Sequence, residues 1–189
     1  MKLVLATRNA HKAREFAVLL APHEIVALPE DVVLPPEVGD SFAANALDKA
    51  RAAAAATGAL TIADDSGIAA EALGGAPGVR SARFAGEDAT DEENLAKLLR
   101  EAPAGSSLAY VCVVAYADPA APGQEKVFEG RCTGTLAAVP RGSGGFGYDP
   151  AFVPDERPGC TMAELAVAEK DAISHRGHAA RALQAWLSA

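Results

Sequence analysis

Short apolar runs alternate along the chain with longer stretches in which apolar residues recur at helical spacing. Lys2–Ala6 is predicted to form a short buried strand, and Ala10–Leu20 has the pattern of a helix that ends before Pro22. Three prolines interrupt Ile25–Val38 and favour an extended, irregular path that carries Glu37 toward the next helix. The chain is therefore expected to begin with a strand, a polar turn and a helix.

The next stretch predicts a second helix followed by a second strand. Ser41 can cap this helix, which continues through an alanine-rich segment to Gly58. Leu60–Ala63 is short, apolar and bounded by polar residues, so it is predicted to be a buried strand. This strand would deliver the carboxylates of Asp64 and Asp65 at its C-terminal end.

The second half of the chain continues the mixture of helices and strands. Thr90 opens a capping box that predicts a helix over Asp91–Ala102. Leu108–Ala117 and Lys126–Thr133 are typical of two long strands joined by a proline-rich loop, and Ser174 is placed to cap a final helix. No internal repeat recurs, so we expect one α/β domain over residues 1–189.

Composition narrows the class of protein. Half of the 189 residues are apolar, which is enough for a substantial core, and no run approaches the roughly 18 apolar residues of a membrane span. The apolar start is too short for a signal-peptide core, so we expect a soluble cytoplasmic protein. A formal charge of −8 argues against direct nucleic-acid binding, although a local anion site remains compatible with it.

The first candidate site is the polar turn between the first strand and the first helix. A helix N-terminus presents unpaired N–H groups and a positive dipole end to phosphate, and a lysine in the first turn adds charge. An ordinary turn with a solvated lysine is the alternative, because the Walker pattern is absent. The residues of this candidate phosphate loop are Thr7, Arg8, Asn9, Ala10, His11 and Lys12.

The second candidate site consists of Asp64 and Asp65, with Glu37 upstream. Adjacent carboxylates are costly to bury without a cation, and Mg²⁺ prefers oxygen ligands of this kind. Since neighbouring strand residues point to opposite faces, one carboxylate would bind metal or water while the other fixes the loop. An Asx-turn with Gly67 at positive φ is the alternative.

The third candidate site is the glycine-rich segment 142–150. Its glycines would let the backbone approach a ligand closely, Phe146 could stack on a base, and Asp149 could accept hydrogen bonds from ring N–H groups. A hairpin turn with a core phenylalanine is the alternative, although four glycines within six residues exceed what a hairpin needs.

The fourth candidate site, residues 169–178, lies at or just before the last helix. His175 and Arg176 could donate hydrogen bonds to a 6-oxo group, and Lys170 could reach a phosphate or a ribose. A solvated, charged helix start is the alternative.

Read together and in order, these segments resemble the inosine triphosphate pyrophosphatase family, also called Ham1-like or RdgB-like. Seven ordered blocks from Leu5 to Arg176 carry the resemblance. They are Ala6-Thr7-Arg8-Asn9 with Lys12, Ser41-Phe42 with Asn45-Ala46 and Lys49-Ala50, Ala63-Asp64-Asp65-Ser66-Gly67, Leu73-Gly74-Gly75-Ala76-Pro77-Gly78, Ser81-Ala82-Arg83, Gly145-Phe146-Gly147-Tyr148-Asp149-Pro150 and Ile173-Ser174-His175-Arg176.

The resemblance implies Mg²⁺-dependent hydrolysis of ITP, dITP and XTP to the monophosphate and pyrophosphate. It implies a mixed twisted sheet with flanking helices, two lobes around a central substrate cleft, and a homodimer. Asp65 would activate the attacking water, and Glu37, Asp64 and Asp65 would form the acidic metal shell. The substrate would be contacted by the loop residues Thr7 to Lys12 and by Lys49, Ser66, Phe146, Gly147, Tyr148, Asp149, Lys170, His175 and Arg176.

One position departs from the family pattern. Where the family commonly has Phe-x-Glu-Asn-Ala, this chain has Ala44 in place of the glutamate, so a metal ligand or a capping-box partner of Ser41 is missing. Arg8 falls at a variable position, where its charge could assist phosphate binding. A catalytically weak nucleotide sensor and a hydrolase of modified pyrimidine nucleotides are the rival functions.

Overall fold

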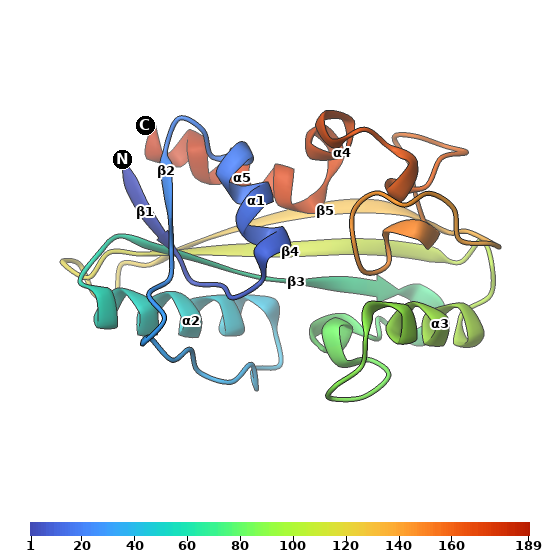
Figure 1. Cartoon of the computed structure of the whole chain (residues 1–189), viewed down its shortest axis with the longest axis horizontal. Coiled ribbons are helices and arrows are strands. Elements are labelled where there is room, and N and C mark those ends of the chain that lie inside the picture. The colour runs from blue at the N-terminus through green and yellow to red at the C-terminus, as the bar shows by residue number, and fades with distance from the viewer. The chain divides into compact units, whose positions relative to one another are not determined.

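The computed structural model of the chain describes residues 1–189 and has the expected mixed α/β architecture. The strands form one sheet in the order β2-β1-β3-β4-β5-β6 (Figure 1). β1 pairs in parallel with β2 and β3, whereas β5 and β6 are antiparallel. The strands are β1 Lys2–Leu5, β2 Glu24–Ala27, β3 Thr61–Ala70, β4 Ser107–Ala117, β5 Lys126–Leu136 and β6 Phe152–Pro154. The helices are α1 Ala10–Leu19, α2 Phe42–Thr57, α3 Asp91–Glu101, α4 Val167–Ile173 and α5 His175–Leu187.

The chain divides into two compact units, each with its own core. The first unit consists of Met1–Asp65, Cys112–Gly130 and Arg176–Ala189. The second consists of Ser66–Val111 and Arg131–His175. Strands β3, β4 and β5 therefore contribute residues to both units.

In the first unit, the strands are apolar on both faces because helices cover each side. Leu3 and Leu5 of β1 belong to a core cluster with Phe16 of α1 and Leu183 of α5. The alternate residues of the same strand pack against the alanines of α2, as Val4 does. Figure 1 accordingly shows α1 and α5 on one face of these strands and α2 on the other.

In the second unit, one cluster joins the strands to the elements that surround them. It contains Ile68 of β3, Leu98 of α3, Tyr110 of β4, Phe152 of β6 and Ile173 of α4. All five are buried, and Ile68, Leu98 and Phe152 are fully so. This core therefore fixes the position of α4 and of β4, the strand that carries Tyr110.

The predicted caps at Ser41, Gly58 and Thr90 are confirmed. Ser41 accepts a hydrogen bond from Ala44 N, and α2 ends at Gly58, whose φ of 62° is the left-handed conformation that glycine adopts readily. Thr90 and Glu93 form the reciprocal capping box at the start of α3.

The structure corrects two expectations around Asp64 and Asp65. Both lie inside β3, which continues to Ala70, so they are not at the end of a short strand. The Asx-turn alternative is also wrong, because Gly67 has no positive φ. Glycine is needed there for close packing instead: a Cβ would meet Gly78 O and Ser81 Oγ, each at 2.4 Å.

Three further elements, β2, β6 and α4, were not predicted as regular structure. β2 includes the first residues of Ile25–Val38, which was expected to be irregular. β6 has only three residues. α4 forms in the segment that was placed just before the last helix.

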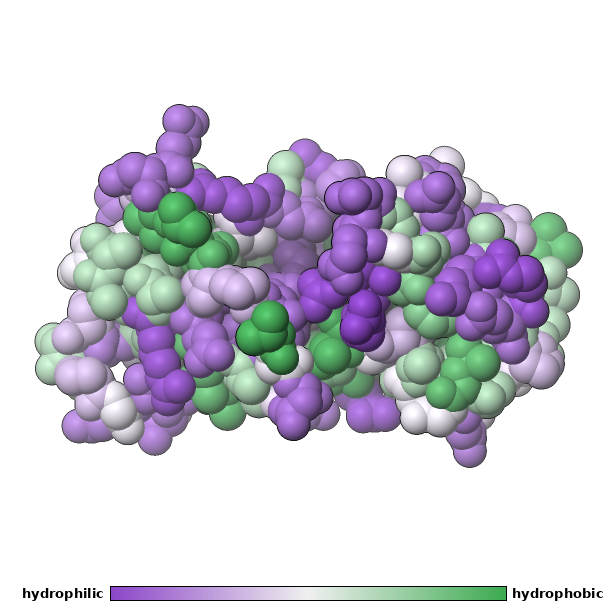
Figure 2. All heavy atoms as spheres, turned by 90° about the horizontal axis from the view of Figure 1, so that it is seen from below, coloured by the Kyte–Doolittle hydropathy of each residue, from purple (hydrophilic) through white to green (hydrophobic).

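None of the helices is both long enough and apolar enough to cross a bilayer. On the face in Figure 2, hydrophobic side chains lie in small, separate groups among hydrophilic ones.

Candidate active site

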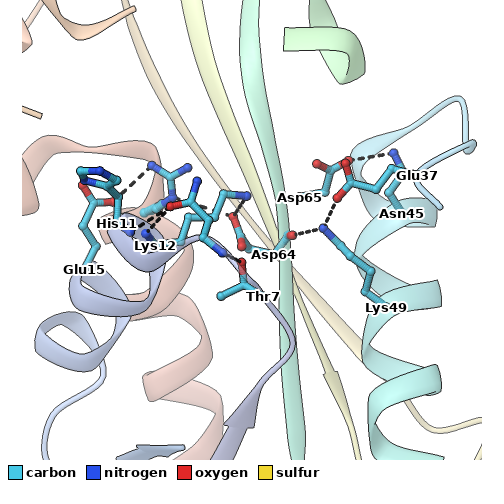
Figure 3. Close-up of polar contacts among 11 residues, drawn as sticks. Thr7, His11, Lys12, Glu15, Glu37, Asn45, Lys49, Asp64 and Asp65 are labelled. Carbon is cyan, nitrogen blue, oxygen red and sulfur yellow. Dashed lines mark hydrogen bonds and ion pairs between the residues drawn. The ribbon is translucent and has the colours of Figure 1, made fainter. Parts of the chain in front are cut away.

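The loop before α1 is shaped by its own polar side chains. Asn9 Oδ1 accepts hydrogen bonds from His11 N at 2.9 Å and from Lys12 N at 3.2 Å, so Asn9 caps the helix. Thr7 Oγ1 in turn accepts a hydrogen bond from Asn9 N at 3.2 Å. The two side chains hold the turn in one shape and leave the Lys12 side chain to project toward β3 (Figure 3).

Lys12 meets the first of the two β3 carboxylates. Its Nζ lies 2.8 Å from Oδ2 of Asp64, whose side chain is completely buried. Nε of Arg176 lies 3.8 Å from the same oxygen, and Nη1 of Arg176 donates to Glu15 Oε2 at 3.2 Å. Burial works to raise the pKa of Asp64, but the charges of Lys12 and Arg176 outweigh it and hold that pKa below its usual value. Asp64 is therefore an ionised carboxylate between two cations.

Asp65 lies in a different environment. Its Oδ2 accepts a hydrogen bond from Nδ2 of Asn45 on α2 at 2.8 Å. Burial raises the pKa of Asp65, and the hydrogen bond from Asn45 only partly opposes that effect. The pKa values of the two neighbouring carboxylates are thus shifted in opposite directions, and Asp65 has the greater affinity for a proton.

Lys49 brings a second ammonium group to this region. Its Nζ donates to Glu37 Oε1 and, at 2.6 Å, to the main-chain oxygen of Asp64. Burial works to lower the pKa of Lys49, but Asp64 and Glu37 outweigh it and raise the pKa above its usual value. Lys49 is therefore a buried, charged lysine held next to the backbone of the paired aspartates (Figure 3).

The acidic groups suit a hard divalent cation that keeps part of its shell as water. No three carboxylate, imidazole or thiol side chains gather closely enough to hold a metal by themselves. Mg²⁺ is commonly bound by one or two carboxylates, with water and substrate phosphate supplying the other ligands. Glu37 and Asp65 fit this requirement. The negative charge of Glu37 contributes to the raised pKa of Asp65, and a bound cation would offset the repulsion between the two carboxylates.

The second unit holds a separate cluster centred on Asp149. Oδ1 of Asp149 accepts a hydrogen bond from Tyr110 Oη at 3.0 Å. Oδ2 accepts from Lys170 Nζ at 2.9 Å and from Phe146 N at 3.0 Å. Both carboxylate oxygens therefore bind donors of the protein, and they fix the glycine-rich loop to β4 and α4.

Aromatic and backbone contacts complete this cluster. The ring of His175 is stacked on Tyr110, with centroids 4.6 Å apart and 9° between the planes. Nζ of Lys170 lies 5.3 Å from the centroid of Phe146. A Cβ on Gly145 would meet Asp149 Oδ2 at 2.0 Å, and Gly145 has a φ of 71°, so only glycine fits there.

Two further hydrogen bonds anchor the same loop. Tyr148 Oη donates to Ser81 O at 2.7 Å, and Gly147 N donates to Asp91 Oδ2 at 2.9 Å. The side chain of Tyr148 is therefore part of the packing beneath the loop.

The profile of the Ham1 family matches residues 3–186, nearly the whole chain. The chain belongs to the Ham1 family. A protein of Symbiobacterium thermophilum named dITP/XTP pyrophosphatase is 50% identical over 190 residues, covering 97% of this chain and 93% of the relative. A protein of the same name from Escherichia coli O157:H7 is also 50% identical over 190 residues, covering 96% of this chain and 95% of the relative.

Solved structures agree with this membership of the Ham1 family. The HAM1 protein from Coxiella burnetii matches with a TM-score of 0.89 and 39% identity, covering 100% of this chain and 98% of the other. A nucleoside-triphosphatase and dITP/XTP pyrophosphatase from Mycobacterium abscessus matches with a TM-score of 0.75 and 45% identity, covering 99% of both chains. The mixed α/β fold predicted by the resemblance to the Ham1 family is thereby confirmed.

The structure sorts the Ham1-type candidate residues into two groups. The first unit contains Thr7, Arg8, Asn9, Ala10, His11, Lys12, Glu37, Lys49, Asp64, Asp65 and Arg176. The second contains Ser66, Phe146, Gly147, Tyr148, Asp149, Lys170 and His175. Arg8 and Arg176 differ most from the roles that the sequence suggested: Arg8 donates to main-chain oxygens, and Arg176 contacts Glu15 and Asp64.

Four residues that contact the candidate site residues had no predicted role there. Asn45 orients Asp65, Tyr110 holds Asp149, Glu15 binds Arg176 and Asp91 binds the glycine-rich loop. Asn45 had a usable signal, because an asparagine on the apolar face of an alanine-rich helix needs a partner when buried. A tyrosine such as Tyr110 within a strand carries no such signal, since aromatic residues are ordinary there.

Proposed function

We propose that this chain is a Mg²⁺-dependent pyrophosphatase that hydrolyses ITP, dITP and XTP to the nucleoside monophosphate and pyrophosphate. The relatives named dITP/XTP pyrophosphatase support this substrate class. The observation that carries the proposal is the arrangement of the buried Lys49 and the partly buried Lys12 with the carboxylates of Glu37, Asp64 and Asp65. Paired cations next to acidic groups suit binding of a polyphosphate and a divalent cation together.

The residues of the first unit would handle the phosphates. The loop of Thr7 and Asn9 holds Lys12 at the helix N-terminus, where its charge would neutralise the phosphate chain. Lys49 adds a second positive charge beside the main chain of Asp64. Both lysines would stabilise the charge that accumulates on pyrophosphate as it leaves.

Asp65 is the proposed general base. A water molecule would attack the α-phosphorus, the bond to the pyrophosphate oxygen would break, and the proton would pass to Asp65. Asn45 orients the carboxylate of Asp65 for this role through the hydrogen bond to its Oδ2. Glu37 and Asp65 would hold Mg²⁺, which would supply charge neutralisation at the phosphates and polarise the water. Asp64 would keep Lys12 and Arg176 in place.

The residues of the second unit would recognise the purine. Phe146 offers a face for stacking, and Lys170 and His175 carry donors suited to a 6-oxo group. Donors placed for a 6-oxo group are left unpaired by the 6-amino group of ATP, which can reduce kcat/KM by factors of about 10⁴. The proposed selectivity against ATP follows from this mismatch.

We also propose that the protein acts in the cytoplasm as a homodimer without a nucleic-acid partner. The formal charge of −8 supports the last point, since nucleic-acid binding by excess lysine and arginine is disfavoured. Sedimentation velocity would report the oligomeric state, and a monomer at micromolar concentration would contradict the dimer.

A substrate panel tests the proposed function. ITP, dITP, XTP, GTP, ATP and modified pyrimidine triphosphates are assayed with Mg²⁺, and pyrophosphate and orthophosphate are measured separately. We expect pyrophosphate from the three deaminated purines. Binding of ITP without any product would favour a sensor, and faster turnover of a pyrimidine substrate would favour the related hydrolase. Either result would overturn the proposal.

A further inference from the structure

The guanidinium group of Arg8 gathers four main-chain carbonyl oxygens of one short segment. Nη1 donates to Leu28 O at 2.9 Å. Nη2 shares its two hydrogens among Pro29 O at 2.7 Å, Glu30 O at 3.2 Å and Val32 O at 2.8 Å. All four acceptors lie on the segment that follows β2, so Arg8 joins the candidate phosphate loop to that segment.

The segment has little regular secondary structure to hold its path. Residues 28–41 form neither helix nor strand. Prolines occupy positions 29, 35 and 36, and a proline has no N–H to donate. Leu28 is buried, and Val32 and Leu34 pack against the core that contains the alanines of α2, whereas Val33 and Val38 are 86% and 84% exposed. Polar contacts therefore act together with this packing to fix the path of the segment.

The polar contacts lie at both ends of the segment. At its far end, Glu37 accepts from Lys49, and Gly39 N donates to Asn45 Oδ1 at 2.8 Å. At its near end, Arg8 supplies the four hydrogen bonds. Glu37 lies between the Arg8 contacts and the hydrogen bond of Gly39, and Lys49 also binds it directly.

We propose that Arg8 is a positioning residue, which fixes the segment 28–37 and so holds Glu37 at the site in the first unit. The proposal rests on the proposed function only in that Glu37 serves the reaction there. It replaces the interpretation in which the charge of Arg8 contacts the phosphates of the substrate. The shape of the guanidinium group is then essential, and its charge alone is insufficient.

Substitution of Arg8 by lysine tests this distinction between shape and charge. Arginine presents five N–H donors in a rigid planar fork, whereas lysine has one nitrogen with three donors. Arg8→Lys keeps the positive charge but cannot reach four carbonyl oxygens at once. Arg8→Met removes both charge and donors. Arg100→Lys on α3, where the arginine is exposed, is the matched control for the exchange of an arginine for a lysine.

The first readout is amide hydrogen exchange of the substrate-free variants. Val32 N, which donates to Pro29 O at 3.2 Å, and Gly39 N are the reporting amides. We expect both Arg8 variants to exchange these amides at least about tenfold faster than wild type, because lost hydrogen bonds promote local opening. The amides of β1 and α2 and the Arg100→Lys control should not change. Unchanged exchange in Arg8→Lys would overturn the proposal.

The second readout is the kinetics of dITP hydrolysis. We expect kcat/KM to fall by a similar factor, about fivefold or more, in Arg8→Lys and Arg8→Met, with a reduced kcat in both. Wild-type kinetics in Arg8→Lys beside a raised KM in Arg8→Met would show a charge contact with substrate and would overturn the proposal. Normal activity in both variants would do the same. If wild type hydrolyses no purine triphosphate, the proposed function fails, while the exchange measurement still decides whether Arg8 fixes the segment.

Discussion

Asn45 on α2 donates a hydrogen bond to Asp65 on β3, with 2.8 Å between Nδ2 and Oδ2. Both side chains are buried, and Oδ1 of Asn45 is itself held by Gly39 N. The amide therefore has no freedom to turn, and it presents Asp65 in one orientation. A helix residue without an assigned chemical role thus sets the direction of the proposed base.

Asn45→Ala should reduce kcat by about 10- to 100-fold, which corresponds to about 1.4–2.7 kcal/mol of transition-state stabilisation. Unfolding free energy should fall by about 1–3 kcal/mol, because Gly39 N loses its buried acceptor. Steady-state kinetics with dITP and urea unfolding measure the two effects.

Asn94 offers a matched control for this prediction. It is an equally buried asparagine on α3, where its side chain accepts from Ala85 N at 2.8 Å and donates to Ala82 O at 3.1 Å. Asn94→Ala should lose comparable stability and keep kcat near wild type. Equal losses of kcat in the two variants would mean that Asn45 acts only through stability.

Gly145→Ala should be strongly destabilising and should raise KM for purine substrates. The added methyl group would meet Asp149 Oδ2 at 2.0 Å and Lys170 Nζ at 3.1 Å, which would separate the pair that holds the loop. Gly159→Ala is the control, since Gly159 also has a positive φ but nothing lies within 4 Å of its added Cβ. Thermal unfolding should show a distinctly smaller loss for Gly159→Ala, and equal losses would point to backbone strain alone.

Tyr110→Phe should raise KM for ITP by about three- to tenfold while changing kcat little, because it removes a binding contact that acts through Asp149. The stacked ring on His175 would be retained. Tyr116→Phe is a suitable control, as Tyr116 is also buried but packs against Trp186 in the first unit. If KM for ITP stays at the wild-type value in Tyr110→Phe, Tyr110 does not support base recognition.

The elements that the sequence predicted well are those with local signals. Ser41, Gly58 and the Thr90–Glu93 capping box mark helix ends through contacts with their own neighbours, and the structure confirms them. The extent of β3 was missed because Asp64 and Asp65 are poor strand formers on local criteria. Sheet pairing and the ion pair with Lys12 override that preference, and both depend on residues distant in the sequence.

The sequence predicted which residues belong to the candidate site better than it predicted what their side chains contact. The resemblance to the family gave the residue types at Lys12, Lys49 and Asp149, but the side-chain partners follow from packing. Arg8 shows the difference: its sequence position suggests phosphate, whereas its two Nη atoms donate to carbonyl oxygens of residues 28–32. Nothing local in the sequence indicates which of these partners a guanidinium group meets.

Ala44→Glu tests what the missing glutamate contributes. Ser41 already accepts a hydrogen bond from Ala44 N at 3.2 Å, so a glutamate there could complete a capping box. We expect a gain of about 0.5–1 kcal/mol in unfolding free energy with an unchanged Mg²⁺ requirement. The Glu93→Ala variant, which opens the existing box of α3, should lose a similar amount. A tenfold or greater fall in the Mg²⁺ concentration for half-maximal rate would instead assign the glutamate to the metal.

The most direct test of the account follows the products of ITP in wild type and in Asp65→Asn. Wild type should release IMP and pyrophosphate with no orthophosphate. Asp65→Asn keeps the size of the side chain but removes the carboxylate that would accept the proton. We therefore expect kcat to fall by about 10²–10⁴ while the fold is retained. Near-normal turnover in Asp65→Asn, or orthophosphate as the product of wild type, would contradict the central claim.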